Sequence, residues 1–292
     1  MSDESYLFEG GSLIIKDKAR GLDKEGFFSP PLIPENLSEG EKSASAYQLV
    51  IEKNSEGFIE QVLLKKGQIF EGESRLYYPC GAVKAQMYYD ESKLHGPSRY
   101  YSKEGRLLSE SWFWKGKKNG KCIQYYPCGK IYSKQYFLEG LEDGLQEFFY
   151  QSGSIKSSMS FVKGLLDGTV CLYHEGSSKK REMQFKMGSR FGLEQQWYEN
   201  GQLMMEKEHE NEKAVGRERH WFLNGQIAEE RLYLSCPEHF NFEQFNDEGQ
   251  RLRKGTFDSE NRYLESVWDD EGRLVEEKRG HFEGQKIVWE KS

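Results

Sequence analysis

The sequence predicts an all-β protein, an elongated single-layer solenoid of about nine 24-residue β-hairpin repeats that form a twisted antiparallel meander. Three observations predict this fold. The same residue types return every 24 residues, turn residues divide each period into two short segments, and those segments alternate β-branched or aromatic residues with polar ones. Because no segment has the 3.6-residue apolar period of a helix, helices are not expected.

The 24-residue period is clearest in segments such as YYPCGAVKAQMYY (77–89) and YYPCGKIYSKQYF (125–137). Glycine recurs at one position of the repeat, with Ser177 as the exception, and a second glycine position follows later in each unit. Two aromatic columns keep the same spacing. One contains Tyr77, Tyr101, Tyr125, Phe149, Tyr173, Trp197, Trp221 and Phe245, and the other Tyr89, Phe113, Phe137, Phe161, Phe185, His209, Tyr233 and Phe257.

Each unit is expected to run strand, tight turn, strand and wider turn. With a three-residue loop at Pro79–Gly81, Tyr78 pairs with Ala82 and Tyr77 with Val83. Glycine then takes the third loop position, where a type I turn with a G1 bulge requires a positive φ. Simple alternation places Tyr77, Val83 and Tyr89 on one face, so both aromatic columns are predicted to share that face, although a further bulge would reverse the alternation locally.

The other face of the first units is then also rich in aromatic rings. A solvated sheet face is normally polar, and Trp and Tyr are frequent interface anchors. We therefore predict a protein-binding surface there, with the alternatives that this face packs on the N-terminal segment or carries stacked tyrosines without a partner. The predicted partner-binding residues are Tyr78, Tyr88, Trp112, Trp114, Tyr126, Tyr136 and Tyr150.

Each unit follows one pattern: two aromatic residues before a glycine, then an aliphatic residue, an aromatic residue and a turn that contains glycine. This pattern resembles the MORN repeat, in its bacterial variant. YYPCGK…YFLEGLEDG at 125–144 is a clear example. The resemblance covers roughly residues 48–292. It implies a hairpin scaffold for protein–protein contacts, with anionic phospholipid headgroups or antitoxin-like neutralisation of a toxin protein as alternative roles.

Composition and motifs exclude several other classes. The net charge of −7 argues against general nucleic-acid binding, and no apolar run is long enough for a transmembrane segment. No secretory signal precedes the repeats, and five widely spaced cysteines suggest neither disulfides nor zinc, so a cytoplasmic location is expected. No catalytic, cofactor or metal motif is found, which predicts a protein that is not an enzyme. His95 is expected to be solvated in a turn, and His209 to be partly buried with a structural role.

The charge distribution and the repeats divide the chain. Residues 1–47 lack the repeat, have a net charge of 5 − 9 = −4, and are predicted to be a partly flexible N-terminal cap or tail. Residues 48–292 form the predicted repeat domain. Within it, residues 48–205 have a net charge of 22 − 18 = +4, which leaves anionic lipid as a possible partner beside the protein partner.

Overall fold

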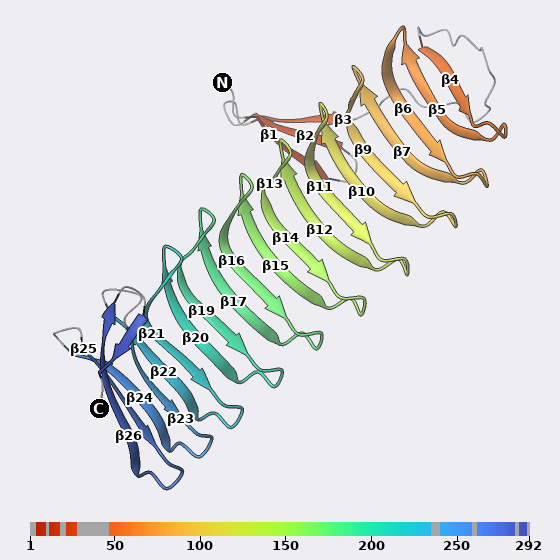
Figure 1. Cartoon of the computed structure of the whole chain (residues 1–292). Helices are drawn as coiled ribbons and strands as arrows, with labels where there is room; N and C mark the ends of the chain where they lie inside the picture. The colour runs from red at the N-terminus through yellow and green to blue at the C-terminus, as the bar shows by residue number, and fades with distance from the viewer. Residues whose placement is uncertain are drawn as a thin grey trace. The chain divides into compact units, whose positions relative to one another are not determined.

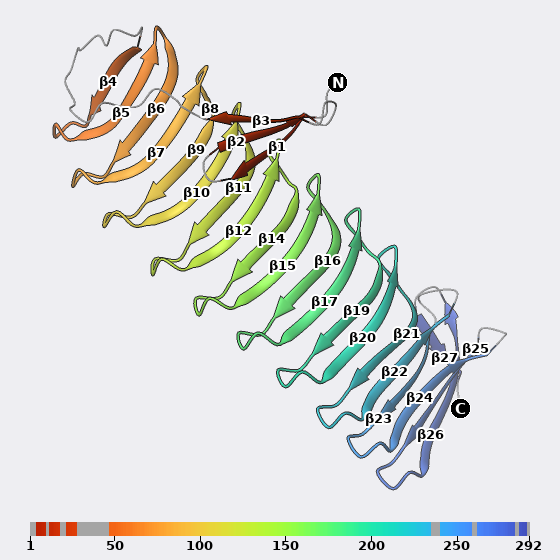
Figure 2. The ribbon, with the colours of Figure 1, turned by 180° about the vertical axis from the view of Figure 1, so that it is seen from behind.

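The computed structural model describes residues 4–9, 12–17, 22–27, 47–234, 240–258, 262–283 and 286–290. These residues contain no helix, and their strands follow one another as hairpins in an open antiparallel meander. Views from opposite sides show strands β4–β14, and separately β16–β24, each in one layer (Figures 1 and 2). The predicted all-β, single-layer repeat fold is therefore confirmed.

The chain divides into two compact units, which we describe separately. The first contains residues 1–153 and 161–164, and the second contains residues 154–160 and 165–292. Strand β15 (Ile155–Val162) contributes to both units.

The first unit contains a small antiparallel sheet, β1-β2-β3, and the first part of the meander. The small sheet lies within the predicted N-terminal cap, and β1 lies against β11. Its strands are β1 (Glu4–Glu9), β2 (Ser12–Asp17) and β3 (Leu22–Phe27), and the meander strands are β4 (Tyr47–Lys53), β5 (Ile59–Lys66), β6 (Ile69–Tyr77), β7 (Val83–Asp90), β8 (Lys93–Leu94), β9 (Gly96–Tyr101), β10 (Leu107–Trp114), β11 (Lys117–Tyr125), β12 (Ile131–Leu138), β13 (Leu141–Glu142) and β14 (Gly144–Phe149).

The second unit continues the same hairpin pattern. Its strands are β16 (Leu165–Tyr173), β17 (Lys179–Lys186), β18 (Ser189–Arg190), β19 (Gly192–Trp197), β20 (Leu203–Glu210), β21 (Lys213–Trp221), β22 (Ile227–Tyr233), β23 (Phe240–Phe245), β24 (Arg251–Phe257), β25 (Arg262–Trp268), β26 (Leu274–Glu283) and β27 (Lys286–Trp289). Each described strand pairs with the next strand of the repeat, so every unit of the repeat supplies one hairpin.

The predicted three-residue loop is present. The Tyr78 N–H donates to the Ala82 carbonyl at 2.8 Å, the Gly81 N–H donates to the Tyr78 carbonyl at 2.8 Å, and Gly81 has φ +82°. Tyr77 pairs with Val83 as expected. This is the type I turn with a glycine in the left-handed conformation, and the recurring glycine of the repeat is explained by it.

The predicted sharing of one face by the two aromatic columns is wrong, and a second irregularity explains why. Leu76 pairs with Ala85 while Tyr77 pairs with Val83, so Lys84 is an extra residue in the second strand. The same one-residue shift follows the loop in the hairpins β9–β10, β11–β12, β16–β17 and β19–β20. An extra residue reverses the alternation of side chains beyond it.

The shift places one aromatic column on each face of the sheet. Met87 pairs with Ser74, three residues before Tyr77, so Met87 and Tyr89 point away from the Tyr77 face. A side-chain contact supports this assignment, because the Tyr100 hydroxyl lies 3.9 Å from the Met87 sulfur and Tyr100 points to the face opposite Tyr101. In the first unit we call the two sides the Tyr77 face, with Tyr77, Tyr101, Tyr125 and Phe149, and the Tyr89 face, with Tyr89, Phe113 and Phe137.

The predicted wider turn is a tight two-residue turn followed by a glycine bend. At Glu139–Gly140 both residues have positive φ, +51° and +91°, as a type I′ turn requires. The Gly140 N–H donates to the Lys118 carbonyl at 2.8 Å, which joins this turn to the preceding hairpin. Gly144 then bends the chain into β14 with φ +91°.

Candidate functional site

The seven aromatic residues predicted to bind a partner do not share one face, because the extra residue after each loop separates them. Four of them lie on the Tyr77 face, namely Tyr88, Trp112, Trp114 and Tyr136. For Trp112, the face follows from Glu110, two residues earlier, which pairs with Arg99 on the face of Tyr101. The rings of Tyr78 and Tyr126 lie on the Tyr89 face, and Tyr150 holds the equivalent position of the next repeat. The prediction that all seven residues form one aromatic binding face is therefore wrong, because four lie on one face of the sheet and three on the other.

The three residues on the Tyr89 face sit just before the loops, and two of them connect neighbouring hairpins. The Tyr78 hydroxyl donates to the Tyr101 carbonyl at 2.8 Å, and the Tyr126 hydroxyl donates to the Phe149 carbonyl at 2.7 Å. The Tyr126 ring also contacts Tyr132 edge-on, with 5.2 Å between ring centroids. These contacts give Tyr78 and Tyr126 a structural role between repeats.

Two residues on the Tyr77 face are buried. Trp112 is 6% exposed and Tyr88 is 7% exposed. The Gln86 amide donates both to the Tyr88 hydroxyl at 3.0 Å and to the buried Glu73 carboxylate at 2.7 Å, and Arg75 binds the same carboxylate at 2.6 Å. Burial raises the pKa of Tyr88, and Glu73 raises it further. These side chains stabilise the sheet and are not available to a partner.

Trp114 packs against His95, with ring centroids 4.4 Å apart. The His95 side chain is only 13% exposed, so the expected solvated turn histidine is wrong. Burial lowers the pKa of His95, although Asp90 opposes this effect from 3.5 Å. His95 is buried because the turn after Trp114 is joined to the preceding repeat by the Gly116 N–H, which donates to the Leu94 carbonyl at 2.8 Å, and the Trp114 indole then covers the His95 ring.

Tyr136 is the most exposed of the seven predicted residues, at 39%. It belongs to a patch on a single hairpin together with Leu141, which is 51% exposed, and Leu145, which is 45% exposed. Leu138 pairs directly with Leu141 and is half-buried beside them. We call Tyr136, Leu138, Leu141 and Leu145 the hairpin patch.

The backbone under the patch is fixed by a buried side chain. The Gln146 amide donates to the Tyr136 carbonyl at 2.8 Å, and its oxygen accepts from the Tyr136 N–H at 3.1 Å. Gln146 is 0% exposed, so both backbone groups of Tyr136 are satisfied away from water. Since β13 and β14 depart here from regular strand pairing, this contact holds the Tyr136 ring in place.

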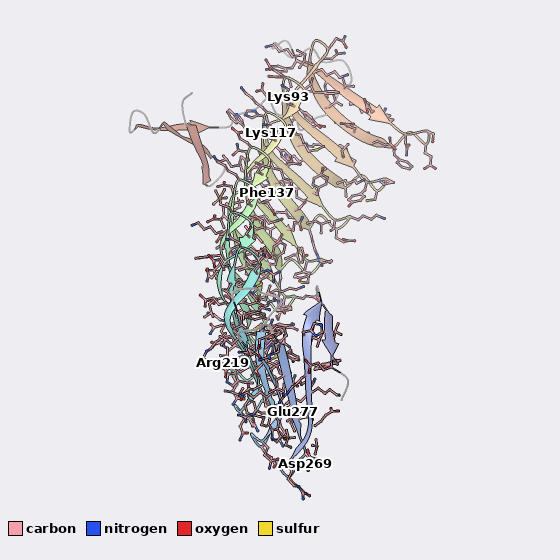
Figure 3. The ribbon with its side chains drawn as sticks, turned by 60° about the vertical axis from the view of Figure 1, so that its left-hand side comes forward. Lys93, Lys117, Phe137, Arg219, Asp269 and Glu277 are labelled. Atoms are coloured by element: carbon pink, nitrogen blue, oxygen red, sulfur yellow. The ribbon has the colours of Figure 1, made fainter. Side chains whose placement is uncertain are left out.

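Lysines border the hairpin patch. Lys121 pairs directly with Tyr136 across β11 and β12, whereas Lys118 lies over the Phe137 ring at 4.7 Å on the opposite, Tyr89 face. Lys93 and Lys117 lie along the edge of the sheet that carries the two-residue turns, near Phe137 (Figure 3). In the repeat, Leu141 and Leu145 occupy the positions of Lys117 and Lys121 one unit earlier. This change from lysine to leucine is the sequence signal that could have located the patch.

The second unit has a different character, with charged groups buried in its sheet. Glu194 is 3% exposed and binds Arg181 at 2.5 Å and His209 at 2.8 Å. Burial would raise the pKa of Glu194, but Arg181 and then His209 lower it below its usual value. His209 is 5% exposed, which confirms the predicted buried histidine.

A second buried carboxylate lies two strands further along the same unit. Glu218 accepts hydrogen bonds from the His220 ring at 2.8 Å and from the Tyr233 hydroxyl at 2.5 Å, and Lys207 lies at 3.2 Å. Burial opposes ionisation, but these partners lower the pKa of Glu218 to about 2. For Tyr233, burial and the bond to Glu218 raise the pKa to about 12. The Glu218 carboxylate therefore stays ionised at neutral pH as part of a buried group of ion pairs, and its pKa is too low for general acid–base catalysis near pH 7.

No metal-binding cluster of His, Cys, Asp or Glu occurs among the described residues. Of the cysteines, Cys80 and Cys128 are free and exposed, Cys122 and Cys171 are free and buried, and Cys236 lies outside the described residues. Within the described residues no helix is long and apolar enough to cross a membrane.

A family model matches two segments of the repeat sequence. The model of the MORN repeat variant matches residues 142–163, from β13 to β15, and residues 192–211, over β19 and β20. The chain therefore contains MORN-variant repeats at these two segments. The matched segments include Gln146, below the hairpin patch, as well as Glu194 and His209. No curated protein matches the sequence.

Solved structures give only distant likenesses. One is the Tc holotoxin pore of Photorhabdus luminescens, at 11% identity, over 84% of this chain and 15% of that chain, with a TM-score of 0.18. Another is a TcdB2–TccC3 structure without its hypervariable C-terminal region, at 11% identity, over 92% of this chain and 16% of that chain, with a TM-score of 0.15. The chain thus spans about a sixth of those chains, and TM-scores this low support no conclusion about its role.

Proposed function

We propose that this chain is a non-enzymatic MORN-repeat scaffold that binds another protein through the hairpin patch. The observation that carries the proposal is the exposure of Tyr136, Leu141 and Leu145 on one hairpin whose neighbouring repeat has lysines at the leucine positions. Exposed apolar groups that lie together and have a polar rim are typical of interaction sites.

The charges around the patch narrow the chemistry of the partner. Lys121 pairs with Tyr136, and Lys117 lies along the same edge, so the rim of the patch is cationic on the side of the preceding repeat, whereas the turn of the patch hairpin carries the exposed Glu139. A partner segment with an apolar side chain flanked by carboxylates fits this surface best, because opposite charges at a rim speed association and set its register. The exposed free thiols of Cys80 and Cys128 fit a reducing, cytoplasmic setting.

The test is a crosslinked pull-down from native lysate with the full chain and the double variant Tyr136→Ser, Leu141→Ser. Both substituted side chains are exposed, so circular dichroism should show an unchanged β content. The matched control is Phe58→Ser, which removes a 48%-exposed ring from a loop of the same unit. We expect one protein, recovered near one-to-one by the full chain and by the control, to be lost with the double variant.

Recovery of the same partners by the double variant would contradict the proposal. Flotation of the full chain with anionic liposomes that fails at raised salt, together with an empty pull-down, would favour the phospholipid alternative instead. Recovery of a toxic protein through the patch would identify the scaffold as an antitoxin-like neutraliser.

A further inference from the structure

Strand β4 (Tyr47–Lys53) forms an edge of the meander in the first unit. All seven of its residues pair with β5, and no residue-by-residue pairing joins it to another described strand. The Asn54 N–H donates to the Phe58 carbonyl at 2.9 Å, within the hairpin. Because backbone groups alternate along a strand, the N–H and C=O groups of Leu49 and Ile51 point away from β5, toward the open edge.

The sequence of β4, YQLVIEK, is complementary to itself when two copies run antiparallel. With Val50 at the two-fold axis, Leu49 of one copy faces Ile51 of the other, and all seven residues are paired. The outward-pointing backbone groups of both copies then meet, as a hydrogen-bonded ladder requires. Gln48 faces Glu52 of the other copy, so no like charges are opposed.

The side chains at this edge continue the apolar cluster of the first unit. Leu49 and Ile51 pack against Val62 and Leu64, which are 0% and 6% exposed. In the antiparallel pair, both copies present these residues on the same face of the joined sheet. Leu49 and Ile51 of the second copy therefore extend the cluster across the edge and lose exposed apolar surface.

We propose that a second copy of this chain binds at β4, so that two molecules form a symmetric dimer through one continuous antiparallel sheet. The edge has no proline, and its two charged residues, Glu52 and Lys53, lie at its C-terminal end and leave the apolar centre of the strand, Leu49–Ile51, without a charge. Two seven-residue strands bury less surface than a standard interface, so we expect a reversible dimer with a dissociation constant on the order of micromolar. This surface is separate from the hairpin patch, and its test does not depend on the proposed scaffold role.

The first test uses disulfide crosslinking of the full chain with Cys80, Cys128 and Cys236 replaced by Ser. In this background Val50→Cys places two thiols at the axis, in a non-hydrogen-bonded pair with Cα atoms about 4.5 Å apart, which suits a disulfide. The matched control is Gln48→Cys. Its two copies would lie about 13 Å apart, four residues along the strand, and cannot be bridged.

We expect mild oxidation to convert Val50→Cys to a covalent dimer on non-reducing gels, while Gln48→Cys stays monomeric. A monomer with both variants, or crosslinking of Gln48→Cys at an equal or higher rate, would overturn the proposal. A sedimentation run in which the unsubstituted chain stays monomeric up to about 100 times the proposed dissociation constant would overturn it as well.

The second test changes the sign of the cross-strand charge. Gln48 and Glu52 are both exposed, so substitutions there leave the hairpin intact. Gln48→Lys places a lysine opposite Glu52 of the other copy, whereas Gln48→Lys with Glu52→Lys places lysines opposite each other, and each contact occurs twice. We expect the single variant to tighten the dimer and the double variant to weaken it, each by about 2- to 30-fold. Equal dissociation constants for the two variants at low salt would contradict the register.

Discussion

The buried carboxylate of Glu218 makes the second unit sensitive to acid. Its pKa is lowered from 4.5 to about 2 by His220, Tyr233 and Lys207, against the effect of burial. At about 1.4 kcal/mol per pKa unit, this difference corresponds to about 3 kcal/mol of stabilisation. Because the pKa is lower in the folded state, the stabilisation is fully present above about pH 4.5 and is lost as the pH falls toward 2.

The perturbation that tests this reasoning is Glu218→Gln. The amide keeps the shape of the side chain but cannot ionise, so the variant should lose up to about 3 kcal/mol of local stability at pH 7 and almost none at pH 2. Glu208→Gln, an exposed change on the adjacent strand β20, serves as the control and should stay within about 0.5 kcal/mol.

Hydrogen exchange measured by mass spectrometry on peptides from β20 to β22 is the suitable assay, because repeat arrays open locally and do not unfold as one unit. Protection factors, corrected for the intrinsic exchange rate, should fall for Glu218→Gln at pH 7 and converge with those of the unsubstituted chain at low pH. A weaker pH dependence from Glu194, whose pKa is also lowered, remains in the variant. Unchanged protection at pH 7, or a full pH dependence in Glu218→Gln, would refute the assigned role.

Three further substitutions test the repeat itself. Ser177 adopts φ +71° where other repeats have glycine, so Ser177→Gly should raise the free energy of unfolding by about 1 kcal/mol in urea titrations, and a loss of stability would contradict the strain. Gln146→Ala leaves the Tyr136 N–H without its partner, while the Tyr136 carbonyl keeps the Asp143 N–H, and should cost about 1–3 kcal/mol, with faster exchange in β12; exchange at the unsubstituted rate would argue against it. Tyr126→Phe removes the bond to the Phe149 carbonyl and should cost about 0.5–1.5 kcal/mol, measured by the same titration, whereas a neutral effect would show that ring packing alone joins these repeats.

The sequence by itself determined the repeat, the hairpin and the loop. The 24-residue spacing predicted about nine hairpins, and the glycine at position 81 and its equivalents indicated the three-residue loop, because only that backbone conformation favours glycine so regularly. These features depend on local chain chemistry, which a single sequence displays.

Only the tertiary structure decided which residues share a face and which are exposed. The extra residue at Lys84 and its equivalents appears only in the pairing of two strands, and it reversed the faces that alternation had predicted. Trp112 is buried and Tyr136 is exposed although both occupy the same position of the 24-residue repeat, so the difference depends on how the neighbouring hairpins cover them. Local preference sets the hairpin, but cross-strand register and the adjacent repeats set its surfaces.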